Sequence, residues 1–133
     1  MKTNILTLCD FAKDYNGQLT IAGTFNRITS SVFPTLPIKF FLVCQFELKD
    51  NIVGDHLVTI SIKNKETGEF LIKTQEFKLN IVRNSDVKDM GAMYTNLLLD
   101  FDKVIFQSPG VYIVDVTSDG HHDDIEFQVV KAS

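Results

Sequence analysis

Residues 38–48 read IKFFLVCQFEL, and this stretch decides the fold. Every second residue of it, from the first to the last, is apolar, while Gln45 and Glu47 make the second half of the other face polar. Side chains alternate between the two faces of a β-strand, so this period of two predicts a strand with one face in a core. Phe41 and Val43 make the first half of the other face apolar as well, which raises the question of what contacts it.

The same alternation recurs along the chain, and turn residues such as Asn16-Gly17 separate the segments. The predicted strands are Thr3–Ala12, Gln18–Ile28, Ile38–Leu48, His56–Asn64, Glu69–Val82, Tyr94–Phe106, Val111–Thr117 and a last strand through Ile125–Val129. No segment has the period of a helix. A single sheet would leave an apolar face exposed to water, so two packed sheets are expected. The connection Thr29–Pro37 is predicted to cross between them. We therefore expect an all-β fold, a single β-sandwich domain (residues 1–133) of about eight antiparallel strands.

In two of these segments the apolar residues change part-way along from even to odd positions, or from odd to even. Glu69–Val82 begins with even apolar positions and ends with odd ones, and Tyr94–Phe106 switches between Phe101 and Val104. A regular strand cannot do this, because a shift of one residue turns every later side chain to the other face. The pattern predicts a β-bulge or break in each segment, and in the first one it falls near Thr74–Glu76.

Charge and composition exclude several classes of protein. The 133 residues are 44% hydrophobic and carry a formal net charge of −4, with a pI near 5.2. Nucleic acids and anionic membranes bind basic surfaces, and no segment concentrates Lys and Arg, so neither is an expected partner. No apolar run is long enough to span a bilayer, and the first residues lack the features of a secretory signal. We expect a cytoplasmic protein in which Cys9 and Cys44 are reduced, buried and unreactive.

The segment His121-His122-Asp123-Asp124 is the strongest candidate for a metal site, because imidazole and carboxylate groups bind zinc, and carboxylates bind calcium. We place it in a predicted loop, Ser118–Asp124. Adjacent residues of a loop rarely point at one centre, so a solvated hairpin loop is the favoured interpretation. A metal-binding regulatory or catalytic protein that uses these four residues is the alternative function.

Phe41, Val43, Val111 and Ile113 are apolar on faces that are predicted to be outward. If they cluster, they mark an interface; otherwise a loop or the N-terminal strand covers them. The leading hypothesis is a non-enzymatic binding or assembly module whose partner is another protein or a second copy of itself. No catalytic group and no cofactor is predicted. A carrier of a small ligand between the sheets is a third hypothesis, disfavoured because eleven Phe residues fill the core.

Several short motifs resemble those of a family of small bacterial proteins of unknown function. The motifs are Leu8-Cys9-Asp10-Phe11-Ala12, Gly17-Gln18-Leu19, Ile21–Ile28, Phe33-Pro34 with Pro37, Ser108-Pro109-Gly110-Val111-Tyr112, and Asp119-Gly120. The resemblance implies a bacterial or phage source and an immunoglobulin-like sandwich, and it implies no activity or cofactor. An inward Tyr112 after a turn is also similar to the tyrosine corner of immunoglobulin-like domains.

Overall fold

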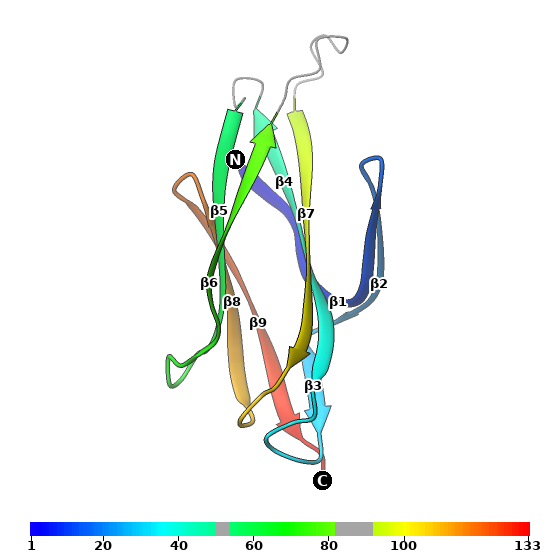
Figure 1. Cartoon of the computed structure of the whole chain (residues 1–133), viewed down its shortest axis with the longest axis vertical. Helices are drawn as coiled ribbons and strands as arrows, with labels where there is room; N and C mark the ends of the chain where they lie inside the picture. The colour runs from blue at the N-terminus through cyan, green and yellow to red at the C-terminus, as the bar shows by residue number, and fades with distance from the viewer. Residues whose placement is uncertain (50–53, 82–91) are drawn as a thin grey trace.

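The structure is a computed structural model that describes residues 1–49, 54–81 and 92–133. Two β-sheets pack face to face (Figure 1). The strands of the described residues are β1 (Lys2–Tyr15), β2 (Gln18–Phe25), β3 (Arg27–Ser30), β4 (Ile38–Lys49), β5 (Gly54–Asn64), β6 (Phe70–Ile81), β7 (Ala92–Val104), β8 (Gly110–Ser118) and β9 (His121–Lys131). The predicted β-sandwich is confirmed. Among these residues, no helix is long and apolar enough to cross a membrane.

Sheet A has the strand order β2-β1-β4-β7, and sheet B has the order β3-β9-β8-β5-β6. All pairs are antiparallel except β3 with β9, which run parallel. The expectation of antiparallel strands only is therefore wrong for this pair. The expected strand Gln18–Ile28 is also wrong as a single unit, because the chain leaves sheet A at Asn26 and continues as β3 in sheet B. Residues 31–37 then return the chain to sheet A, a crossing that was predicted.

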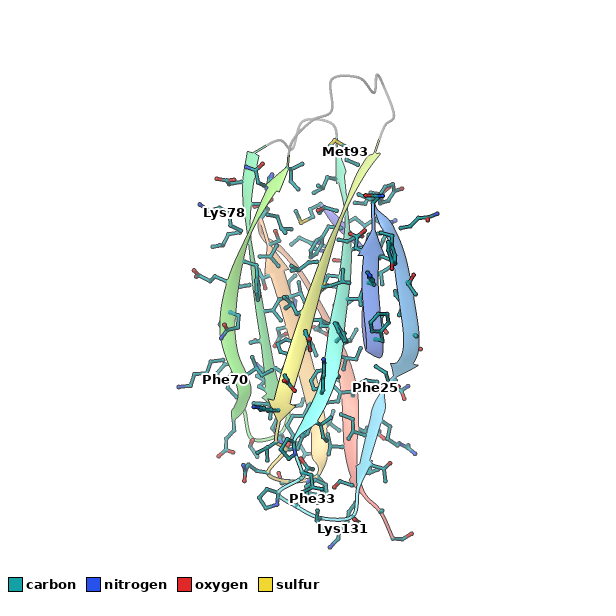
Figure 2. The ribbon with its side chains drawn as sticks, turned by 45° about the vertical axis from the view of Figure 1, so that its right-hand side comes forward. Phe25, Phe33, Phe70, Lys78, Met93 and Lys131 are labelled. Carbon is teal, nitrogen blue, oxygen red and sulfur yellow. The ribbon has the colours of Figure 1, made fainter. Side chains whose placement is uncertain are left out.

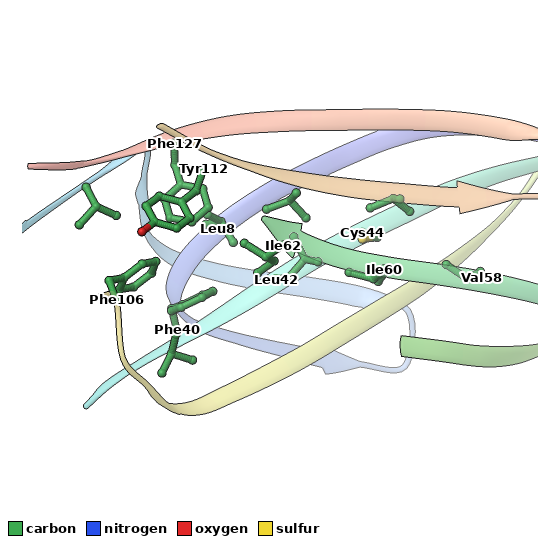
Figure 3. Close-up of a cluster of buried hydrophobic side chains, with 14 of the residues drawn as sticks. Leu8, Phe40, Leu42, Cys44, Val58, Ile60, Ile62, Phe106, Tyr112 and Phe127 are labelled. Atoms are coloured by element: carbon green, nitrogen blue, oxygen red, sulfur yellow. The ribbon is translucent and has the colours of Figure 1, made fainter. Parts of the chain in front are cut away.

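The main core lies between the sheets and follows the alternation read from residues 38–48. Phe40, Leu42, Cys44 and Phe46 of β4 are at most 1% exposed and belong to one cluster with the inward residues of β5 and β8 (Figure 3). At one end of this core, Tyr112 packs against Phe106 and Phe127, with ring centroids 5.1 and 5.7 Å away. Burial of these rings stabilises that end of the core.

Both predicted changes of parity coincide with irregular strand pairing. On β6, Ile72 pairs with Ile62 but Gln75 pairs with Ile60, so β6 holds one extra residue close to Thr74. A second register shift follows between Ile72 and Phe70, which pairs with Lys63. On β7 the extra residue lies between Phe101 and Val104, where Lys103 has a φ of 56°. Each bulge turns the following apolar residues back toward the core.

The β1–β2 hairpin adds a third layer on the outer side of sheet A. β1 pairs with β4 up to Cys9, then bends away, and its second half rises beside β7 together with β2 (Figure 1). A second apolar cluster fills the space beneath, with Cys9, Ala12 and Val43 buried at its centre. Leu19 and Ile21 belong to this cluster and not to the main core, while Phe25, at the end of β2, packs on the main core (Figure 2).

Side-chain hydrogen bonds join the hairpin to the sheet below it. Asn96 of β7 donates from Nδ2 to Asp14 Oδ2 of the hairpin over 3.1 Å, and it accepts at Oδ1 from Gln45 Nε2 over 3.0 Å. Together with the second cluster, these bonds hold the hairpin against the face that Phe41 and Val43 make apolar.

Candidate functional site

The β8–β9 hairpin positions the residues that the sequence marks as metal ligands. Asp119 and Gly120 both have positive φ, 48° and 76°, as the two-residue turns that favour Asp-Gly require. Because the turn takes only these two residues, Ser118 already pairs with His121. The predicted loop Ser118–Asp124 is therefore wrong: β9 begins at His121, and all four candidates lie on a strand.

Strand alternation divides the four candidates between two faces. His121 and Asp123 belong to the inward series that continues to the buried Phe127 and Val129. His121 Nε2 lies 3.1 Å from Thr3 Oγ1 of β1. His122 and Asp124 point outward from sheet B, so the four do not form one ligand set. The structure brings the outward pair together and separates it from the inward pair.

Asp115 completes a cluster with the outward pair. It pairs directly with Asp124 across β8 and β9, and its Oδ1 lies 2.9 Å from His122 Nε2. Asp124 Oδ2 lies 3.9 Å from the same nitrogen. One ligand atom from each of the three residues lies within 4.8 Å of the others. Asp115 was not among the predicted ligands, although a two-residue turn at Asp119-Gly120 would have placed it opposite Asp124.

A lysine from the neighbouring strand borders this cluster. Lys63 Nζ of β5 is 3.9 Å from Asp115 Oδ2. The side chain of Asp115 is 23% exposed, against 51% for His122 and 43% for Asp124. The cluster therefore lies on the outer face of sheet B, open to solvent and held by three adjacent strands.

The predicted interface residues fall on two different sheets. Phe41 and Val43 lie on the outer side of sheet A, and Val111 and Ile113 lie on the outer side of sheet B. Val43 is fully buried under the β1–β2 hairpin, so its placement on an exposed face is wrong. The N-terminal strand covers it, which was the alternative interpretation. The four residues do not form one continuous patch.

Phe41 nevertheless borders an exposed aromatic surface, which we call the Phe11 patch (Phe11, Phe41, Lys39 and Asp100). Phe11 is 48% exposed and meets the ring of Phe41 edge to face, with centroids 5.9 Å apart. Lys39 Nζ lies 5.7 Å from the centre of the Phe41 ring and 3.4 Å from Asp100 Oδ2. Sequence reasoning missed Phe11, because the apolar residues on both faces of its strand suggested that both faces would be covered.

Val111 lines an open groove between β3 and the ends of β8 and β9. The groove has a volume of about 330 Å³, and its other lining residues include Arg27, Glu126 and Gln128. Arg27 Nη2 donates to Gln128 Oε1 over 3.2 Å. The lining is mostly polar and carries both signs of charge, so no particular ligand class follows from it.

Both thiols are buried and free. Burial raises the pKa of Cys44 to about 12, with a smaller contribution from the negative charge of Asp123. Burial also raises the pKa of Cys9, whose Sγ donates to the carbonyl oxygen of Phe11 over 3.4 Å. A thiolate is the reactive form, so neither cysteine is poised as a nucleophile near neutral pH.

A second group of polar residues lies at the end of the sandwich where the β8–β9 turn meets the start of β5. His56 Nδ1 contacts Asp119 Oδ2, while His56 Nε2 and the hydroxyl of Ser118 are buried without a hydrogen-bond partner among the residues that the structure describes. Buried polar atoms of this kind are commonly satisfied by an ordered water molecule.

Sequence comparison connects the chain to one family. A family described as "Family of unknown function (DUF6941)" matches residues 4–130. The chain belongs to this family. No curated protein matches the sequence.

Solved structures with a similar fold are parts of much longer proteins. A β-glucosidase from Listeria innocua in complex with glucose is 12% identical with a TM-score of 0.55, and the match covers 97% of this chain and 15% of that chain. An alkylpurine DNA glycosylase, AlkC, from Pseudomonas fluorescens bound to DNA containing an abasic site analog is 18% identical with a TM-score of 0.51. That match covers 79% of this chain and 28% of the glycosylase. These likenesses concern the fold alone.

Proposed function

We propose that this protein is a non-enzymatic assembly module that pairs with a second copy of itself through the Phe11 patch. The exposed ring of Phe11 is the observation that carries the proposal. An aromatic side chain that is 48% exposed on a sheet face costs hydration free energy, which burial in an interface would recover. Aromatic residues are also enriched among those that dominate binding energy.

The charges of the patch favour a second copy as the occupant. Lys39 and Asp100 lie side by side next to the two rings, and both are about half exposed. In a dimer with a two-fold axis the same patch meets itself, so Lys39 of one copy can approach Asp100 of the other while the rings pack at the centre. A surface of one sign of charge would repel its own copy.

The buried thiols support a non-enzymatic role, because the strongest nucleophiles of the chain are kept protonated and away from solvent. Within the sandwich we infer an immunoglobulin-like arrangement. Its support is Tyr112, whose hydroxyl donates to the carbonyl oxygen of Ser108 over 2.8 Å, as in a tyrosine corner. The bacterial source and the cytoplasmic location stay predictions.

Size-exclusion chromatography with light scattering over a concentration series tests the proposal. We expect a dimer whose dissociation constant rises at least about tenfold in Phe11→Ala, a loss typical of an aromatic anchor. Val32→Ala is the matched control, because Val32 is equally exposed, at 51%, outside the patch. A monomeric wild type, or equal weakening by both variants, would overturn the proposal.

A further inference from the structure

We propose that Asp115, His122 and Asp124 bind a divalent transition-metal ion, for which Zn²⁺ is the probe. The three residues come from two strands that are locked together by the β8–β9 ladder. This site lies on sheet B, away from the Phe11 patch, and it does not depend on self-association. The proposed ligands are His122 and Asp124, two of the four consecutive residues that the sequence suggested, together with Asp115 from the neighbouring strand.

The electrostatics of the pair explain why a cation would be stabilised here. Asp115 and Asp124 lie directly opposite each other on adjacent strands, and like charges in that position destabilise a sheet. Lys63 approaches Asp115, and the distance of 3.9 Å is long for an ion pair. Lys65 lies near enough to Asp124 for their charges to interact, but it forms its ion pair with Glu126. A divalent ion between the two carboxylates would neutralise both charges at once, which the single positive charge of Lys63 cannot do.

The geometry is close to that of a metal site before the ion binds. Zinc holds nitrogen and oxygen ligands at about 2.0–2.2 Å, so two ligand atoms on one tetrahedral zinc lie about 3.4 Å apart. The two distances from His122 Nε2, 2.9 Å to Asp115 and 3.9 Å to Asp124, bracket that value. The third pair, Asp115 and Asp124, has ligand atoms within 4.8 Å of each other. Ion binding would require these two carboxylates to move by rotation of their side chains.

The ligand types select the class of metal. One imidazole with two carboxylates suits zinc and related first-row ions, and solvent exposure leaves room for water as a further ligand. Calcium prefers six to eight oxygen ligands, and neither the imidazole nor the small number of carboxylates supplies them.

The experiment is isothermal titration calorimetry of the untagged chain with ZnCl₂. We expect one ion per chain. Loss even of a group that only supports a ligand costs about 10- to 100-fold in metal affinity, so His122→Ala and Asp124→Asn should each raise Kd at least about tenfold. Asp115→Asn provides an independent third test. Circular dichroism checks that each variant is folded.

His121→Ala and Asp123→Asn are the matched controls, because they change the same residue types on the same strand but on its inner face. They should bind Zn²⁺ as the wild type does. Absence of zinc binding would overturn the proposal, as would weakening by the inner variants equal to that by the outer ones. Calcium that binds more tightly than zinc would overturn the assignment of the metal class.

Discussion

The carboxylate of Asp10 on β1 occupies the space that a Cβ atom on Gly23 of β2 would fill, with Oδ2 2.5 Å from that position. The two residues lie where β1 leaves β4 and the hairpin bends over sheet A. Gly23 also has a φ of 71°, in the region that side chains rarely adopt. Backbone conformation and close approach thus require glycine at the same point.

Gly23→Ala should destabilise the protein more than a change at another glycine of similar φ. Gly68 has a φ of 77° with open space around it, so Gly68→Ala measures the backbone cost alone, about 1 kcal/mol. The exposed Asp10 carboxylate can rotate away, but Asp10 Cβ also lies 3.1 Å from the added atom, so crowding should add about 1 kcal/mol at Gly23. Urea denaturation measures both, and a double variant with Asp10→Ala should recover part of the added loss. Equal effects at the two glycines would contradict this explanation.

Tyr112→Phe should lower the free energy of unfolding by about 1 kcal/mol, because it removes the bond to the carbonyl oxygen of Ser108 and keeps the packing of the ring. Tyr94→Phe is the control. Its hydroxyl donates to Glu47 over 3.3 Å on a residue that is 57% exposed, so the loss should stay within about 0.5 kcal/mol. Urea denaturation of the two variants decides whether the Tyr112 bond matters for stability.

Val43→Ala should cost about 1–3 kcal/mol of stability and leave the dissociation constant of the dimer unchanged, since the side chain lies under the hairpin and not on the surface. Val32→Ala, at an exposed position, should change stability by less than about 0.5 kcal/mol. Denaturation and light scattering on the same samples separate the two effects. A variant of Val43 that dissociates the dimer without losing stability would show that the residue reaches a partner.

Cys44 should make stability depend on pH in the alkaline range. Its pKa is raised from 9.0 to about 12 in the folded protein, so the folded state holds a proton that the unfolded state loses first. The contribution of this thiol to stability is complete below about pH 9 and is lost as the pH rises toward 12. Urea denaturation of wild type and Cys44→Ala, at neutral pH and above pH 9, should show a steeper alkaline loss in the wild type.

The same burial predicts slow reaction of both cysteines with a thiol reagent such as Ellman's reagent near neutral pH. Protein unfolded in guanidinium chloride is the control, and there both thiols should react fully. Rapid reaction of one thiol in the folded protein would show that its side chain is accessible.

The sequence was informative wherever a local pattern sets the structure. Apolar parity located the bulges near Thr74 and after Phe101, because a bulge is a change of register within one strand. The inward position of Tyr112 followed from the same alternation. His122 and Asp124 of the candidate site were among the residues named from the sequence. Asp115 was missed because Ser118–Asp124 was assigned to a loop. The pairing of Asp115 with Asp124 follows only once the turn is known to contain two residues.

The departures come from contacts between distant residues. A local sign of the crossing at Asn26 does exist, because the apolar positions change from odd to even between Phe25 and Ile28, and Arg27 takes the next odd position. Parity alone does not say which strand the chain joins after the break. That crossing depends on β9, where Gln128 donates from its backbone nitrogen to the carbonyl oxygen of Asn26 over 2.9 Å. The apolar outer face at Val43 was likewise ambiguous, since exposure depends on whether the hairpin folds over it.

The parallel pairing of β3 with β9 has a consequence for how the chain folds during synthesis. Arg27 and Gln128 are neighbours in the sheet but 101 residues apart in the chain. As the polypeptide leaves the ribosome, β3 emerges early and must wait, unpaired, until β9 has been translated. Pairing across so long a loop is slow, and an exposed strand edge invites contact with other chains during the delay. β3 therefore needs protection until β9 has been made, and pairing with β9 ends its exposure.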